Sequence, residues 1–278
     1  MLVQLAMQAA SGTLLIRDWV EARALWDRLV AIEGLRALVL MPTHDHVIVP
    51  PHQAFRVKEA SRSFAMWRNH HRGEYGKVWR HGARPVPIEG DDHLTRAIRY
   101  FMLNPCRAQL VADPLAWPFS THRDMLGLAW PAARRPVSDP DGFHGYVSAD
   151  KAVDPHGTPL PVSPEPWRIE RASLQEVRAA ISSLTRTPTS LLTRRGSIRT
   201  LLLRAARVLT GLPVRHIAEA YGVHASTVSR AASPRRDDPR VALVARVLTD
   251  PRFGPLTDDD LPWLNPHFRR RRSGCGRC

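Results

Sequence analysis

Prolines divide this chain into two stretches of different character. Eight of them fall among mostly polar residues, at positions 131, 136, 140, 155, 159, 161, 164 and 166. Proline lacks a backbone N–H and fixes φ, so a helix or a central strand does not continue through such a run. We therefore predict a semi-rigid linker over residues 131–172, between a domain at 1–130 and a second at 173–250. Residues 251–278 are expected to form a basic tail.

The first stretch alternates between helical and extended patterns. Apolar residues at helical spacing predict a helix over residues 18–34, ended by Gly34. Two further helices are predicted over residues 52–71 and 91–105, the latter capped by Asp91 or Asp92 and ending before Pro105. Strands are expected over residues 2–9, 35–40 and 46–49, and residues 77–90 are expected to be extended, with their prolines limiting them to a sheet edge. The mixture predicts an α+β domain.

The second stretch is helical throughout, and residues 211–232 fit a helix-turn-helix. Ile217 and Ala218 are placed to face the core, Gly222 to make the turn and Val228 to be buried on the second helix. That helix would offer short polar side chains and an arginine to the major groove of DNA: His224, Ser226, Thr227, Ser229 and Arg230. The competing interpretation is a helical hairpin that only packs.

The charge indicates a polyanionic partner. Forty Lys+Arg against 26 Asp+Glu leave +14, with an isoelectric point near 11.0. A GC-rich genome would explain arginine in place of lysine but not the excess over acids, so nucleic acid is the favoured partner. The cations expected to track phosphates between aromatic residues of the same segment are Arg56, Lys58, Arg62, Arg68, Arg72, Arg80 and Arg84. The alternative is a solvated helix face with buried aromatic anchors.

Other classes of protein are disfavoured by the sequence. No apolar run is long enough to span a bilayer, and the apolar N-terminus has no basic lead of a signal peptide. Three cysteines do not make a disulfide framework, and the Cys275–Cys278 pair lacks the second pair of a zinc site. We expect a cytoplasmic, nucleoid-associated protein, either monomeric or homodimeric.

Two histidines and a later helix carry the residues best suited to chemistry. His44 and His46 share one face of a strand about 6.5–7 Å apart, close enough to converge on one metal ion. Alone, the pattern is more typical of partly exposed strand histidines than of a metal site. Tyr100 and Asn104 lie one helical turn apart and offer a phenol nucleophile and a carbonyl oxygen for a hard cation. Taken singly, they also fit a core aromatic and a helix C-cap.

Three motifs in order carry a resemblance to a known family. The strand segment reads MPTHDHVIV, the helix reads RAIRYFMLNPCRA, and PFST follows at residues 118–121. Residues 1–130 thereby resemble the REP-associated tyrosine transposases of the single-tyrosine HUH superfamily. The matching positions of the helix motif are Arg99, Tyr100, Asn104, Pro105, Arg107 and Ala108. The C-terminal block resembles the DnaA- or Trp-repressor-like helical domain that some members carry.

The resemblance implies a ferredoxin-like antiparallel sheet with helices, in an enzyme that nicks and rejoins single-stranded DNA. Tyr100 would attack the scissile phosphate and hold the 5′ end as a phosphotyrosine, while His44, His46 and Asn104 would bind Mg²⁺ or Mn²⁺. The partner would be a single-stranded or hairpin DNA element, contacted also through Arg107, with duplex DNA as a further partner of the helix-turn-helix. No nucleotide cofactor is expected, because no Gly-rich phosphate-binding loop is present.

Two departures from the family pattern favour other functions. Asp45 stands between the histidines, where the family usually has an apolar residue. It could orient an imidazole, face solvent, or mark a decayed site. The amino terminus is also short, so the first strand must come from about residues 2–9. The runner-up is therefore a catalytically decayed, domesticated DNA-binding regulator that acts through its helix-turn-helix, and a third candidate is a metal-dependent nuclease with water as nucleophile.

Overall fold

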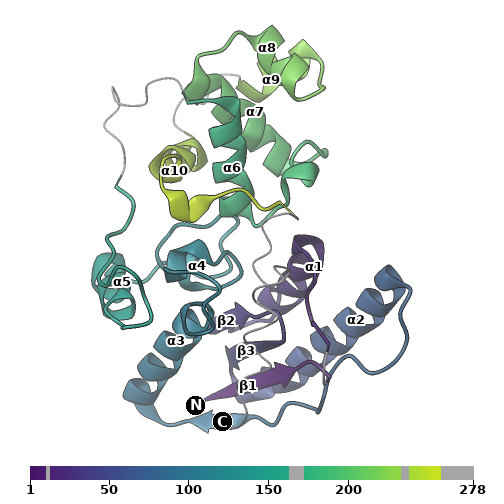
Figure 1. Cartoon of the computed structure of the whole chain (residues 1–278), viewed down its shortest axis with the longest axis vertical. Coiled ribbons are helices and arrows are strands. Elements are labelled where there is room, and N and C mark those ends of the chain that lie inside the picture. The colour runs from purple at the N-terminus through teal and green to yellow at the C-terminus, as the bar shows by residue number, and fades with distance from the viewer. Residues whose placement is uncertain (11–12, 163–171, 233–237, 258–278) are drawn as a thin grey trace. The chain divides into compact units, whose positions relative to one another are not determined.

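The computed structural model describes residues 1–10, 13–162, 172–232 and 238–257 (Figure 1). It divides into two compact units, one of residues 1–127 with 132–158 and one of residues 128–131 with 159–257. In this described part no helix is long and apolar enough to cross a membrane. The Cys275–Cys278 pair and residues 258–278 of the predicted basic tail lie outside the described residues.

The first unit is built on a four-stranded antiparallel sheet in the order β2-β3-β1-β4. Its order along the chain, β-α-β-β-α-β followed by a third helix, is the sequence of elements that the ferredoxin-like arrangement requires. The α+β class predicted from the sequence is confirmed. The elements are β1 (Leu2–Gln8), α1 (Trp19–Val30), β2 (Ala37–Leu40), β3 (His44–Val49), α2 (Ala54–Arg72), β4 (Val86–Ile88), α3 (Gly90–Arg107), α4 (His122–Met125) and α5 (Pro140–Ser148).

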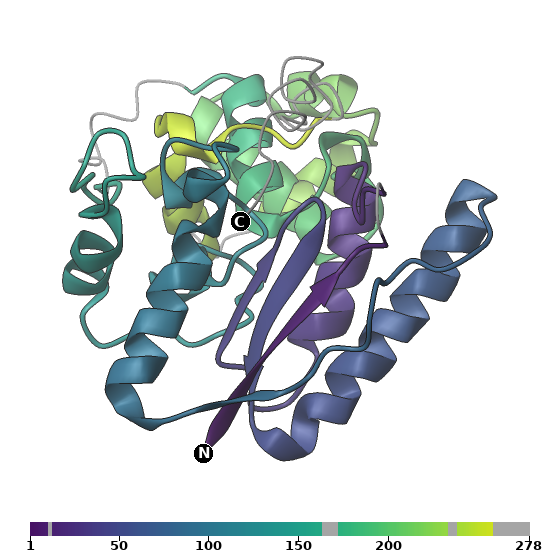
Figure 2. The same cartoon turned by 60° about the horizontal axis from the view of Figure 1, so that its bottom comes forward.

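The two faces of the sheet differ in chemistry because side chains alternate along each strand. On β1, Val3, Leu5 and Met7 are buried, whereas the residues between them are partly or fully exposed. The register places Met7 opposite Asp45 and Ala6 opposite His46. Figure 2 shows α1 and α2 together on one side of the sheet and α3 on the other. The histidines of β3 lie on the α3 side, because His46 contacts Phe101 of α3.

Helices α1 and α2 are joined by apolar packing and by a buried ion pair. Asp18 caps α1 by accepting a hydrogen bond from the Glu21 N–H. Leu25 and Phe64 are fully buried, and each contributes about 1.5–3 kcal/mol through removal from water. Glu21 is 1% exposed and accepts hydrogen bonds from two nitrogens of Arg72 on α2. The helix pair therefore has a fixed charged contact as well as an apolar one.

Helix α3 continues past Pro105, which corrects the predicted end. The helix runs from Gly90 to Arg107 with Pro105 inside it, and no side chain caps its start at Glu89. Proline lacks the N–H that would bond to the carbonyl four residues back, but the last turn closes through other groups. The N–H groups of Ala108 and Leu110 donate to Asn104 and Pro105 carbonyls. Asn104 is therefore inside the last turns, not a C-cap.

The segment after α3 extends the sheet by one isolated bridge and then returns to α3. Ser120 bridges to Val39 of β2, and the Leu40 N–H donates to the Phe119 carbonyl. Phe119 stacks on Trp19, and the Trp117 Nε1–H donates to the Leu40 carbonyl. Within the range predicted as linker, residues 140–148 form α5, which contacts α3. Its N-cap is Asp139, followed by a proline at the first helical position, an arrangement that starts a helix rather than preventing one.

The second unit is helical, with α6 (Leu174–Thr185), α7 (Ser197–Thr210), α8 (Val214–Ala220), α9 (Ala225–Ala232) and α10 (Pro239–Val247). Ser173 and Glu176 form a capping box at the start of α6. Between α8 and α9, Gly222 has φ +60, a left-handed conformation that a Cβ disfavours. Ile217 and Val228 are fully buried where these helices pack. The side chain of Asp238 caps α10 and pairs with Arg204 of α7 and with Arg240.

Candidate active site

His44 and His46 project from the same face of β3, as their spacing predicts. Their ring centroids lie 4.9 Å apart with the planes nearly perpendicular. The Thr43 hydroxyl lies 3.1 Å from Nδ1 of His44. Burial, with a contribution from His44, lowers the pKa of His46 to about 4. His46 is therefore neutral at physiological pH and keeps a nitrogen lone pair for a metal ion.

Asp45 lies on the opposite face of β3 from both histidines. It is 0% exposed, and neither carboxylate oxygen has a hydrogen-bond partner within the described residues. Burial raises its pKa to about 8, and the nearby Met7 backbone offsets only part of that effect. Asp45 is thus buried in the α1 and α2 layer, which excludes both a solvent-facing carboxylate and one that orients an imidazole.

Tyr100 reaches the histidines from α3. Its ring centroid is 5.8 Å from that of His46, and its side chain remains accessible, at 46% exposure. Arg107, two turns further along α3, places its guanidinium carbon 5.3 Å from the centre of the Tyr100 ring. A cation over the ring of a tyrosine stabilises negative charge that develops on the phenol oxygen. The phenol, the two imidazoles and the guanidinium therefore lie close together, and the Tyr100 side chain is accessible to solvent.

Asn104 lies one helical turn beyond Tyr100 and is 8% exposed. Its amide nitrogen is buried and donates no hydrogen bond among the described residues. A buried N–H donor without a partner is unfavourable by about 1–3 kcal/mol, and an acceptor such as a phosphate oxygen would satisfy it. The carbonyl oxygen of the same amide is the atom that could ligate a cation. Two imidazoles and an amide are donors that Mg²⁺ and especially Mn²⁺ accept, so this set fits a divalent cation.

The predicted DNA-contacting cations of residues 56–84 fall into two groups. Lys58, Arg62, Arg80 and Arg84 are exposed, and Arg56 is exposed while paired with Glu59. Arg68 and Arg72, by contrast, have side chains only 4% and 5% exposed. For these two the prediction is corrected, because their N–H groups are used inside the protein. They donate to the Leu14 and Leu15 carbonyls and pair with Glu21 and Glu74.

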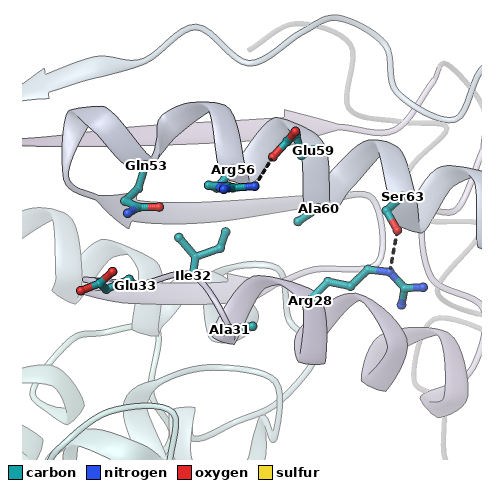
Figure 3. Close-up of a pocket in the computed structure, with 9 residues that line it drawn as sticks. All are labelled: Arg28, Ala31, Ile32, Glu33, Gln53, Arg56, Glu59, Ala60 and Ser63. Carbon is teal, nitrogen blue, oxygen red and sulfur yellow. Dashed lines mark hydrogen bonds and ion pairs between the residues drawn. The ribbon is translucent and has the colours of Figure 1, made fainter.

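A cavity of about 530 Å³ lies between α1 and α2, which cover the face of the sheet opposite α3 (Figure 2). Figure 3 shows that Arg28 from α1 reaches Ser63 on α2, and that Arg56 turns toward Glu59. The opposite charges that line it neutralise one another. The cavity therefore has neither the imidazoles nor the exposed phenol of the site around Tyr100.

Asp18, Glu21 and His71 form a second group that could hold a metal ion, and sequence spacing did not reveal it. The carboxylate of Glu21 already accepts hydrogen bonds from Arg72 and from the Arg17 N–H. The Asp18 side chain caps α1. Because these oxygens are engaged by cationic or N–H donors, the group is explained as a structural contact.

In the second unit, the residues predicted to read DNA lie at the start and along one side of α9. His224, Ser226, Ser229 and Arg230 are exposed, and Thr227 is half-buried. His224 lies before the first turn of α9, where its Nδ1 is 2.8 Å from the Ser226 hydroxyl. Arg230 donates back to the Ser226 carbonyl. These side chains are accessible to a partner from solvent.

Comparisons with known proteins give one partial likeness. No family model matches the chain, and no curated protein matches it. Among solved structures, a REP-associated tyrosine transposase bound to a REP hairpin is 21% identical over 49% of this chain and 93% of that chain, with a TM-score of 0.38.

Proposed function

We propose that this chain is a DNA-binding transposase of the REP-associated tyrosine type, which nicks and rejoins single-stranded DNA at a hairpin or sequence element. The observation that carries the proposal is the approach of the Tyr100 phenol to His46, with His44 beside it. These residues come from a strand and a helix far apart in sequence. Their order and spacing also match the motifs that resemble this family.

In the proposed reaction the Tyr100 oxygen attacks the scissile phosphorus and the bond to the 3′ oxygen breaks. The 3′ oxygen takes up the proton that the phenol loses and leaves as a hydroxyl. The 5′ end stays on Tyr100 as a phosphotyrosine. Attack by a 3′-hydroxyl reverses the step and rejoins the strand. Arg107 faces the Tyr100 ring and stabilises charge there. A Mg²⁺ or Mn²⁺ ion held by His44, His46 and Asn104 would neutralise the non-bridging phosphate oxygens.

The test is a nicking assay on hairpin-bearing single-stranded DNA with Mn²⁺. Wild type is expected to cut and to leave a covalent protein–DNA adduct, and Tyr100→Phe is expected to do neither. Tyr146→Phe is the matched control, because it removes an exposed phenol of the same unit and keeps the ring that packs on Arg99. Equal cutting by Tyr100→Phe would refute the mechanism, and cutting without any adduct would indicate water as the nucleophile.

The second candidate is a DNA-binding regulator without catalysis, acting through α8 and α9. The observation that favours it is the tight turn at Gly222 between two packed helices, with Ser229 and Arg230 exposed on the second. Mn²⁺ binding separates the two functions. The enzyme requires an affinity for Mn²⁺ that is lost when His44 and His46 are replaced by alanine, whereas the regulator requires none.

A further inference from the structure

Tyr100 is connected to a carboxylate that lies outside the motifs of α3. The side chain of Asp150 is 17% exposed and lies between Arg99 and Arg107. Its Oδ2 is 3.2 Å from Nη2 of Arg107 and 3.8 Å from Nη2 of Arg99. Arg107 is the same residue whose guanidinium covers the Tyr100 ring. One acidic group thus touches the cation next to the proposed nucleophile.

The backbone around Asp150 is held in place by several hydrogen bonds. Its Oδ1 accepts from the Ala152 N–H, and its carbonyl accepts from the Val153 N–H. The Asp154 N–H donates to Ala112, just beyond α3, and the Gly157 N–H donates to Ser148 at the end of α5. These hydrogen bonds hold the Asp150 carboxylate in one position, although the loop lies in the proline-rich range predicted to be a linker.

A buried polar chain fastens the same loop from its other end. Nε2 of His122 lies 3.1 Å from Nδ1 of His144, and Nε2 of His144 lies 3.2 Å from the Thr158 hydroxyl. That hydroxyl donates to the Asp113 carboxylate. All four side chains lie in residues that are at most 8% exposed. Buried hydrogen-bond networks of this kind make a segment rigid, because each group loses a partner if the segment moves.

Arg107 is the adaptable member of the pair. Its side chain is 40% exposed, and a solvated arginine samples many rotamers. Asp150 engages one edge of the guanidinium, which has five N–H groups in a planar fork. The remaining donors are left for another acceptor beside the Tyr100 ring. An acid this close to the proposed position of the phosphate opposes DNA binding by its charge. The same carboxylate restricts the rotamers of the arginine with which it pairs.

We propose that Asp150 is a positioning residue, which holds Arg107 over Tyr100 so that the free N–H groups of Arg107 meet the phosphate under attack. The proposal rests on the proposed function, since it takes Tyr100 as the nucleophile. It extends the site beyond residues 1–130, to the loop after α5. It also separates two effects of one carboxylate, a small electrostatic cost to binding and a larger gain in the rate of cleavage.

The experiment is a double-mutant cycle on single-turnover cleavage of a hairpin oligonucleotide with Mn²⁺, at saturating protein. Asp150→Ala is expected to slow cleavage by about 10- to 100-fold, as expected for a misplaced phosphate contact. The apparent Kd for DNA should change by less than about threefold, because the charge contribution to binding is small. In an Arg107→Ala background, Asp150→Ala should slow cleavage by less than about twofold, since its partner is already absent.

Two further variants keep the result interpretable. Asp154→Asn removes the same charge from an exposed position of the same loop and is expected to cut at the wild-type rate. Asp150→Asn keeps the size and one acceptor oxygen, so it should fold if Asp150→Ala does not, and should fall between wild type and Asp150→Ala. Thermal melting of each variant confirms folding.

Two outcomes would overturn the inference. Equal slowing by Asp150→Ala with and without Arg107 would mean that Asp150 does not act through Arg107. Faster cleavage with tighter binding would mean that the carboxylate competes with DNA for the arginines. Tyr100→Phe in the same assay reports on the proposed function separately: if it cuts as well as wild type, the nucleophile is wrong and the inference falls with it.

Discussion

Asp45 gives a prediction whose size can be worked out from its surroundings. The carboxyl group is fully buried, and burial raises its pKa to about 8. In the unfolded chain an aspartate has a pKa of about 3.9. At neutral pH the folded protein therefore holds Asp45 protonated, whereas the unfolded chain releases the proton.

The sign follows from which state binds more protons. Between the two pKa values the folded protein binds one proton more, so the free energy of unfolding falls as pH rises. The slope is about 1.4 kcal/mol per pH unit and flattens above pH 8, which gives a loss of about 2 kcal/mol between pH 6.5 and 8.5. His46 opposes this loss by only about 0.4 kcal/mol, because it is neutral in the folded protein at a lowered pKa of about 4 and is about half protonated at pH 6.5 in the unfolded chain.

Asp45→Asn removes the titration and keeps the shape. Urea unfolding of metal-free protein, followed by tryptophan fluorescence, is measured at both pH values. On going from pH 6.5 to 8.5, the free energy of unfolding of the variant is expected to rise by about 2 kcal/mol relative to that of wild type. Glu33→Gln, at an exposed position, should keep the wild-type dependence. A difference between wild type and Asp45→Asn that is the same at both pH values would refute a neutral, buried carboxyl.

Two further predictions separate the buried cations of α2 from the exposed ones. Arg72→Ala leaves the buried Glu21 carboxylate without its main cation. The free energy of unfolding, measured with urea, should therefore fall by about 3–5 kcal/mol. Arg62→Ala, at an exposed position, should change stability by less than about 0.5 kcal/mol. In salt titrations of single-stranded DNA binding, Arg62→Ala should reduce the slope of log K against log salt by about 0.7. An unchanged slope would place α2 outside the DNA path.

Local patterns in the sequence predict most of the elements of the first unit. Alternation along residues 44–49 is sufficient to place both histidines on one face, and helical spacing from Trp19 to Leu29 is sufficient to predict α1. Tyr100 and Asn104 follow from the same reasoning, since both lie within one helix. What brings α3 onto the histidine face is tertiary packing, seen in the contact of His46 with Phe101.

Two of the failures of prediction come from contacts between distant residues, and a third comes from local hydrogen bonding at a helix end. Arg72 looks like a surface cation until Glu21, 51 positions earlier, is placed beside it. A charged residue such as Asp45 is expected at the surface or in a functional site. The register that pairs Asp45 with Met7 places it in the core. Pro105 suggests a helix end, yet the carbonyls of Asn104 and Pro105 complete the last turn through later N–H groups.

The buried chain from His122 to Thr158 also determines where this protein can be divided. A truncation after residue 130 would follow the domain boundary predicted from the prolines. It would, however, remove Val147 and Val153, which are 0% and 1% exposed. It would also take His144 from beside His122 and remove α5, which contacts α3. A shortened protein that keeps the first unit whole should therefore end after Thr158.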